Sequence, residues 1–232
     1  MEIEPVDKDE WKTNIIAIYD KMKIHKDAYD IQFGDRTITV LPNVFSPKYF
    51  TDSLYFAEQL PTIVGDKSLL EIGTGTGIIA LYCALGGAQV VATDINPDAI
   101  ENARINFAKY HLDIPVIQSD IYKTLNAGSK FDFIFWNHPF NNWDEPVTET
   151  LLRSGLDYHY QDLTDYIAGA RQHLTEGGRL LLGTGNNADL ATIQRLASDN
   201  SYSLRLITEE VLPLEQDGAL INSYLIYEFV TS

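Results

Sequence analysis

Residues 134–142 read IFWNHPFNN, so an apolar run ends in polar side chains around a proline. Asn137 can offer its side-chain oxygen as a hydrogen-bond acceptor, and the backbone carbonyl of His138 can offer a second, because Pro139 fixes the backbone and carries no competing N–H. Phe140 adds an aromatic face for a planar group. Two such acceptors bind an amide or amino nitrogen more tightly as it becomes cationic. Residues 137–140 are therefore the candidate catalytic group.

His138 leaves two other interpretations open. An imidazole whose pKa lies near neutrality can act as a general base. The residue could also simply occupy a surface turn.

A second group of residues suited to chemistry lies at 71–77, which read EIGTGTG. Three alternating glycines let the backbone turn tightly and approach a ligand more closely than a Cβ would allow. Asp94 stands nineteen positions after Gly75, at the end of the next predicted strand. A carboxylate at that place can accept hydrogen bonds from both hydroxyls of a ribose, so the spacing predicts a nucleoside-bearing cofactor.

The loop differs from that of dinucleotide-binding proteins. Their G-x-G-x-x-G pattern would require a third glycine at position 78, where this chain has Ile78, and Gly77 comes one residue earlier. Glu71 also precedes the loop, and an acid suits a sulfonium or amino group better than a pyrophosphate. A dehydrogenase stays open as an alternative.

Strands and helices alternate from residue 67 onward, which predicts a doubly wound, Rossmann-like α/β sheet of mostly parallel strands. The C-terminal segment departs from this alternation with two strands joined by a polar loop, which predicts an antiparallel pair at the edge. The expected strands, seven in all, are 68–73, 88–95, 115–120, 131–137, 178–185, 201–212 and 221–230, and the expected helices are 77–87, 97–111, 162–174 and 190–200. In such a sheet, ligands bind at the carboxyl ends of the strands.

Residues 1–60 are interpreted as a short N-terminal cap, and residues 61–232 as the main domain. Within the cap we expect a helix over 8–23, an extended pair at 29–33 and 36–41, and a loop leading into a helix over 53–60.

The stretch LLEIGTGTGIIALYCALGGAQVVATDINPDAIENARINF resembles the cofactor half of class I S-adenosylmethionine-dependent methyltransferases, and the resemblance covers most of residues 67–230. It implies that the glycine loop surrounds the methionine part of S-adenosylmethionine, that an acid holds the ribose, and that later strand ends contact the adenine. The residues so implied are Glu71, Gly73, Thr74, Gly75 and Gly77 for the methionine part, Asp94 for the ribose, Ile95, Asn96, Asp120 and Ile121 for the adenine, and Asn137 beside the methyl group.

The NHPF stretch resembles the (N/D/S)-P-P-(Y/F/W) motif of amino methyltransferases that modify glutamine in proteins or amino groups of adenine and guanine in nucleic acids. His138 departs from that motif, which keeps the carbonyl but leaves the substrate class open. Residues 41–61 resemble the segment before the cofactor loop in the methyltransferase small domain group. That resemblance implies an aromatic roof over cofactor or substrate, and Trp143 could line the acceptor site beside it. The roof residues are Phe45, Tyr49 and Phe50.

The net charge of the chain bears on the class of substrate. The chain has 17 Lys and Arg against 33 Asp and Glu, a net charge of −16, which disfavours a nucleic-acid partner and favours a small molecule or a protein. The single cysteine, Cys83, excludes an internal disulfide and multi-cysteine metal sites, and no histidine pair has metal-ligand spacing. No apolar run of membrane-spanning length and no signal peptide is present, so we expect a cytoplasmic protein without membrane contact.

The sequence thus predicts an S-adenosylmethionine-dependent N-methyltransferase that acts on a planar amide or amino nitrogen of a small molecule or protein side chain, with no metal. A nucleobase amino methyltransferase and a non-catalytic S-adenosylmethionine-binding module stay open as alternatives. The oligomeric state is left open.

Overall fold

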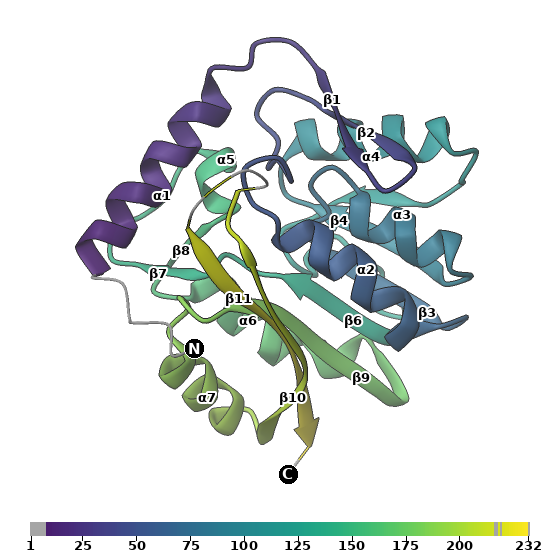
Figure 1. The fold of residues 1–232 in the computed structure, drawn as a ribbon. Helices are drawn as coiled ribbons and strands as arrows, with labels where there is room; N and C mark the ends of the chain where they lie inside the picture. The colour runs from purple at the N-terminus through teal and green to yellow at the C-terminus, as the bar shows by residue number, and fades with distance from the viewer. Residues whose placement is uncertain (1–7, 216–217, 219, 232) are drawn as a thin grey trace.

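A computed structural model describes residues 8–215, 218 and 220–231. Within these residues, seven strands form one sheet in the order β10-β11-β9-β6-β3-β4-β5 (Figure 1). The strands are β3 (Ser68–Ile72), β4 (Gln89–Asp94), β5 (Val116–Gln118), β6 (Phe131–Asn137), β9 (Leu174–Gly185), β10 (Tyr202–Pro213) and β11 (Ile221–Thr231). The predicted seven-stranded, doubly wound sheet is confirmed.

The direction of the strands also follows the prediction. β3 pairs in parallel with both β4 and β6, β4 with β5, and β6 with β9. β11 runs antiparallel to β9 and β10, which is the expected C-terminal pair. The chain runs outward from β3 through β4 to β5 and then returns to place β6 on the other side of β3, so the switch point lies between β3 and β6.

Helices cover both faces of the sheet (Figure 1). Alternate residues of one strand enter different cores: Leu69 packs with one layer and Leu70 with the other. This alternation is the period-2 pattern of a strand buried on both faces. The first layer contains α2 (Asp52–Val64), α3 (Ile78–Leu85) and α4 (Pro97–Lys109), and the second contains α6 (Gln161–Gly169) and α7 (Leu190–Asp199).

The predicted N-terminal hairpin is confirmed, with β1 (Tyr29–Phe33) antiparallel to β2 (Arg36–Val40), which ends one residue before the predicted bound at residue 41. Two buried asparagines of α4 attach it to the domain. Asn102 accepts a hydrogen bond from the backbone N–H of Leu41 and donates one to the carbonyl of Thr39. Asn106 accepts from the N–H of Thr39 and donates to the carbonyls of Thr39 and Thr76. These side chains satisfy the open edge of β2.

The helix α1 (Lys8–Lys23) forms a third core at the end of the sheet where the strands β3 and β6 finish. Its buried Trp11, Ile15 and Tyr19 pack with residues of the loop before α2, of α5 (Thr150–Arg153), of β8 (Leu156–Tyr158) and of the turn after β10. The partners are Phe50, Leu151, Leu156 and Leu214. Figure 1 shows α1 lying beside α5.

Three short elements were not predicted, and some predicted helices end at other residues. β7 (Asn141–Trp143) and β8 form a short parallel pair, and α5 has four residues, so all three are too short for a periodic pattern. α2 continues past Pro61 to Val64, which places the expected boundary at residue 60 inside a helix. The predicted helix over 162–174 is α6 followed by a 3-10 turn (Ala170–Gln172).

Over the described residues, no helix combines the length and apolar character needed to cross a bilayer.

Replacing Asn106 with alanine tests the attachment of the hairpin. Asn106→Ala removes three hydrogen bonds of the side chain and leaves buried backbone groups without partners. We expect a loss of about 1–3 kcal/mol in the free energy of unfolding, measured by urea denaturation. Glu101→Ala, on an exposed position of the same helix, is the control. Equal stability of the two variants would contradict the assignment.

Candidate functional site

A cavity of about 100 Å³ opens at the carboxyl ends of β3, β4, β5 and β6. We call it the switch-point cavity. Most of the residues that the sequence assigned to cofactor binding line it. These are Gly73, Thr74, Gly75, Asp94, Ile95, Asn96, Asp120, Ile121 and Asn137. Residues far apart in the sequence thus meet at one place, as the doubly wound topology requires.

The three glycines of the loop have different tasks, although all have positive φ. A Cβ at Gly73 would come within 2.8 Å of Nε1 of Trp136, whereas a Cβ at Gly75 would meet nothing within 4 Å. Gly75 therefore leaves open space beside the loop. Gly77 does not line the cavity: a Cβ there would lie 2.8 Å from the ring of Phe107, so this glycine permits close packing of α3 on α4.

Glu71 also lies behind the loop rather than in the wall of the cavity. Its side chain is buried and accepts a hydrogen bond from the hydroxyl of Thr74, which does line the cavity. Burial raises the pKa of Glu71 to about 8, against the opposing effect of the Thr74 hydrogen bond. In the free protein, Glu71 therefore does not line the cavity itself but holds the Thr74 side chain that does.

Asp94 connects the glycine loop to the start of α4. One carboxylate oxygen accepts the N–H of Gly75 at 2.9 Å, and the other accepts the N–H of Asn96 at 2.9 Å. Burial raises its pKa, and these backbone hydrogen bonds oppose that shift. A carboxylate has about four acceptor positions, so Asp94 keeps capacity for a ligand. Asn96 caps α4 by accepting the N–H of Asp98 at 3.0 Å.

Arg153 of α5 was missed by the sequence analysis. It lines the switch-point cavity and pairs with Asp162 at 2.7 Å and with Asp120 at 3.8 Å. It is the only basic side chain among the described lining residues, which include the three carboxylates of Asp94, Asp120 and Asp162. This excess of acid favours a ligand with a positive charge.

The side chain of Asn137 is fixed in an informative orientation. Its amide nitrogen donates to a carboxylate oxygen of Asp52 at 2.8 Å. Its carbonyl oxygen Oδ1 is buried and has no hydrogen-bond partner among the described residues. A buried acceptor without a partner costs free energy in the folded protein, and a ligand donor can satisfy it.

A second cavity, of about 30 Å³, lies beneath α1, and we call it the roofed cavity. His138 and Phe140 line the roofed cavity, whereas Asn137 and Pro139 line the switch-point cavity. Residues 137–140 thus separate the two spaces. Phe45 lines both, and its ring stacks on Phe50 with the centroids 4.9 Å apart. The other aromatic walls are Trp11, Tyr19 and Tyr224.

His138 is neither of the two alternatives that the sequence left open. It is 1% exposed, so it is not a surface turn residue. Its Nε2 lies 2.9 Å from the hydroxyl of Thr184, and burial lowers its pKa to about 3. The imidazole is therefore neutral at physiological pH and a weak proton acceptor.

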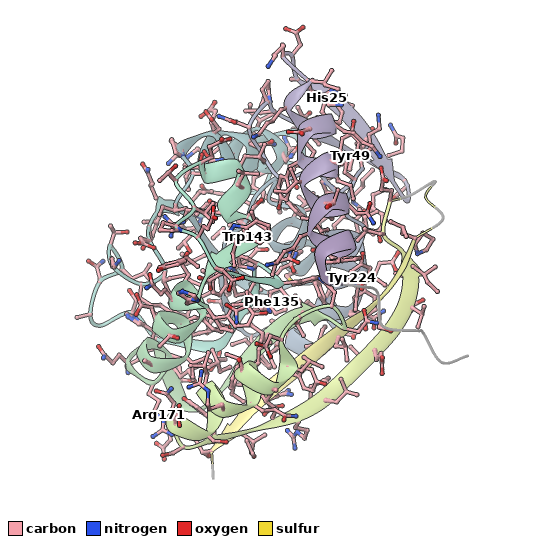
Figure 2. All side chains as sticks on the ribbon, turned by 90° about the vertical axis from the view of Figure 1, so that its left-hand side faces the viewer. His25, Tyr49, Phe135, Trp143, Arg171 and Tyr224 are labelled. Atoms are coloured by element: carbon pink, nitrogen blue, oxygen red, sulfur yellow. The ribbon has the colours of Figure 1, made fainter. Side chains whose placement is uncertain are left out.

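Two predicted aromatic residues lie away from both cavities. The hydroxyl of Tyr49 is 2.7 Å from Nε2 of His25, at the C-terminal end of α1 (Figure 2), and Tyr49 lines a separate open groove. Trp143 packs against the α1 core, with Nζ of Lys12 5.1 Å from its ring centroid. Phe45 and Phe50 are the parts of the expected roof that line a cavity.

Within residues 8–215, 218 and 220–231, no three side chains of His, Cys, Asp or Glu lie close enough together to hold a metal ion.

The chain resembles known proteins in sequence and in fold. The family profile described as the methyltransferase small domain matches residues 35–198. A protein of Methanocaldococcus jannaschii, provisionally named a protein N5-glutamine methyltransferase, is 38% identical over 162 residues, which cover 67% of this chain and 79% of that protein. The bifunctional methyltransferase of Rickettsia felis is 36% identical over 156 residues, which cover 62% of this chain and 29% of that protein.

A solved structure shares the fold. The 16S rRNA N2 G1207 methyltransferase of T. thermophilus, in complex with AdoMet and guanosine, superposes with a TM-score of 0.63 at 20% sequence identity, covering 88% of this chain and 50% of that one. The family profile covers more than half of the sequence. The chain therefore belongs to the methyltransferase small domain family.

Proposed function

We propose that this enzyme transfers the methyl group of S-adenosylmethionine to a planar amide or amino nitrogen of a protein side chain or small molecule. The observation that carries the proposal is the buried Oδ1 of Asn137, which has no partner among the described residues while its amide nitrogen is held by Asp52. An amide oxygen fixed in this way is suited to accept an N–H from an acceptor substrate.

The cofactor would occupy the switch-point cavity. The cationic methionine part would lie over Gly75, where the structure leaves open space. The ribose hydroxyls would donate to Asp94, which has acceptor capacity beyond its two backbone hydrogen bonds. Ile95, Ile121 and Asp120 would surround the adenine. The methyl group would then point toward Asn137.

Methyl transfer is an in-line displacement, so the geometry of the acceptor nitrogen carries much of the catalysis. Asn137 Oδ1 and the carbonyl of His138 would hold the hydrogens of that nitrogen, and both hydrogen bonds would strengthen as the nitrogen becomes cationic. Phe140 lines the roofed cavity, where its ring would contact the planar acceptor.

A protein side chain or a small molecule fits the acceptor site better than a nucleic acid. The net charge is −16, and neither Lys nor Arg is among the described residues that line the roofed cavity. The relative from Methanocaldococcus jannaschii, of which this chain covers 79%, carries the name of a protein-glutamine enzyme. The rRNA enzyme of T. thermophilus makes a nucleobase the alternative outcome of the test.

Transfer of labelled methyl groups tests the function. We expect wild-type enzyme to label a glutamine-containing peptide or a small planar amine or amide, and to leave ribosomal RNA fragments unlabelled. Asn137→Ala should lower kcat by about 10²–10³-fold with cofactor affinity retained, because it removes an acceptor that acts in the transition state. Asn126→Ala, an exposed position, is the control. Cofactor binding without transfer to any of these acceptors would indicate a binding module instead.

Asp94→Ala tests the position of the ribose. Loss of a hydrogen bond to a charged group should weaken S-adenosylmethionine binding by about 1.5–3 kcal/mol, measured by calorimetry. Asp113→Ala, an exposed position elsewhere, should bind as wild type does. Undiminished affinity in the Asp94 variant would refute the ribose assignment.

The raised pKa of Glu71 predicts how the stability of the protein depends on pH. Its pKa is raised in the folded protein, so the folded state holds a proton that the unfolded state has lost. The stability of the free protein should therefore fall as pH rises from about 4.5 to about 8. Glu71→Gln should reduce this fall, as read from thermal melting at several pH values. Glu101→Gln, an exposed acid, should melt with the wild-type pH dependence; identical curves for Glu71→Gln would contradict the assignment.

A further inference from the structure

We propose that Asp52 accepts the proton that the acceptor nitrogen loses during methylation. The inference rests on the proposed N-methyl transfer. It adds to that function a residue outside the NHPF stretch, placed beside it by the N-terminal part of the chain.

Asp52 has the position that such a role requires. It stands at the start of α2, is 4% exposed, and lines the roofed cavity together with His138 and Phe140. One carboxylate oxygen is 2.8 Å from the amide nitrogen of Asn137. The other has a 3.5 Å contact with the hydroxyl of Ser53, which leaves acceptor capacity toward the cavity. The acceptor nitrogen would therefore lie near both the Asn137 oxygen and the Asp52 carboxylate.

The groups that surround Asp52 leave it as the available base. Tyr19 of α1 and Tyr224 of β11 face it, and its charge contributes to raising the pKa of both phenols, so they stay protonated. His138, after β6, has a pKa lowered to about 3 by burial. None of the described residues that line the roofed cavity is Lys or Arg. No cation therefore competes for the carboxylate in the free enzyme.

The proposed step balances in atoms and charge. The nitrogen lone pair forms the N–C bond to the methyl carbon while the C–S bond breaks, and its electron pair goes to sulfur. The sulfonium becomes a neutral thioether, and the nitrogen becomes cationic. The nitrogen then passes one proton to the Asp52 carboxylate, which becomes neutral and releases the proton to water after the product leaves.

The pKa of Asp52 is consistent with the role that its position indicates. Burial raises its pKa to about 6, and hydrogen bonds from Asn137 and Ser53 oppose that shift. The carboxylate form that can accept a proton therefore predominates above about pH 6 and is lost below it. The acidic limb of the kcat profile should follow this titration.

The decisive variant is Asp52→Asn. An asparagine at this position can still accept the N–H of Asn137, so positioning is retained, but it cannot take a proton. We expect kcat with the acceptor identified by labelling to fall by about 10²-fold or more and the acidic limb near pH 6 to disappear. Asp52→Glu should restore part of the rate and an acidic limb. Glu58→Gln, an exposed position on α2, should keep the wild-type profile.

A binding measurement needs no acceptor. The probe is the S-adenosylmethionine analogue in which a carbon bearing an ammonium group replaces the methylated sulfur, so that the ammonium occupies the place of the transferred methyl. At pH 8, Asp52→Asn should weaken binding of this analogue relative to S-adenosylhomocysteine by about tenfold or more, because a charge-assisted interaction is lost. Glu58→Gln should leave the ratio unchanged.

The outcomes separate the two proposals. Absence of methyl transfer by the wild-type enzyme would count against the proposed function. A wild-type affinity ratio in a folded Asp52→Asn variant would overturn the inference about Asp52. A wild-type pH profile in Asp52→Asn with a loss of activity in Asp52→Ala would also overturn it, since that combination shows a residue that only positions Asn137.

Discussion

The parallel pairing of β3 with β6 is the constraint on which the rest of the site depends. Its register sets Ile72 opposite Trp136, so the bend at Gly73 begins beside the strand end that carries Asn137. The approach is so close that a Cβ at Gly73 would meet the indole of Trp136 at 2.8 Å. A shift of one residue would turn every side chain of β6 to the opposite face. The position of the proposed methyl donor relative to its acceptor is thus a property of the sheet.

Several buried polar groups near the ends of β3 and β6 raise the free energy of the folded protein, and a bound ligand can lower it. Glu71 and Asp52 are buried acids with raised pKa values, and Asn137 Oδ1 is a buried acceptor with no partner among the described residues. Each lowers the stability of the empty protein compared with a solvated or satisfied group. A cationic cofactor and an N–H donor would provide the missing interactions. The cost in the free enzyme is thereby coupled to binding, as is common at functional sites.

The N-terminal segment completes the site on the side that the sheet leaves open. Asn102 and Asn106 hold the hairpin against α4, and the chain then passes over the switch-point cavity at Asn43 and Phe45 before Asp52 reaches Asn137. α1 closes the roofed cavity with Trp11 and Tyr19. The Trp11 indole donates to Asn141 at 2.8 Å, next to the NHPF stretch. A segment interpreted as a cap thus supplies walls of both cavities and the residue that holds the amide nitrogen of Asn137.

The sequence by itself determined the fold and most of the wall of the switch-point cavity. Period-2 and helical patterns define strands and helices locally, and the loop at 73–75, Asp94 and Asn137 are each tied to the end of a strand, so topology alone brings them together. Only the tertiary structure decided which residues stand behind that wall. Gly77 and Glu71 support the loop from its far side, Tyr49 and Trp143 pack elsewhere, and His138 is buried and neutral. The resemblance of residues 41–61 drew attention to the aromatic residues of that segment and not to Asp52, whose contact with Asn137 spans 85 positions of the sequence. Arg153 lies in a four-residue helix that gives no local signal, and its place in the site arises from the packing of that helix. Such contacts depend on how separate elements dock, which local periodicity does not encode.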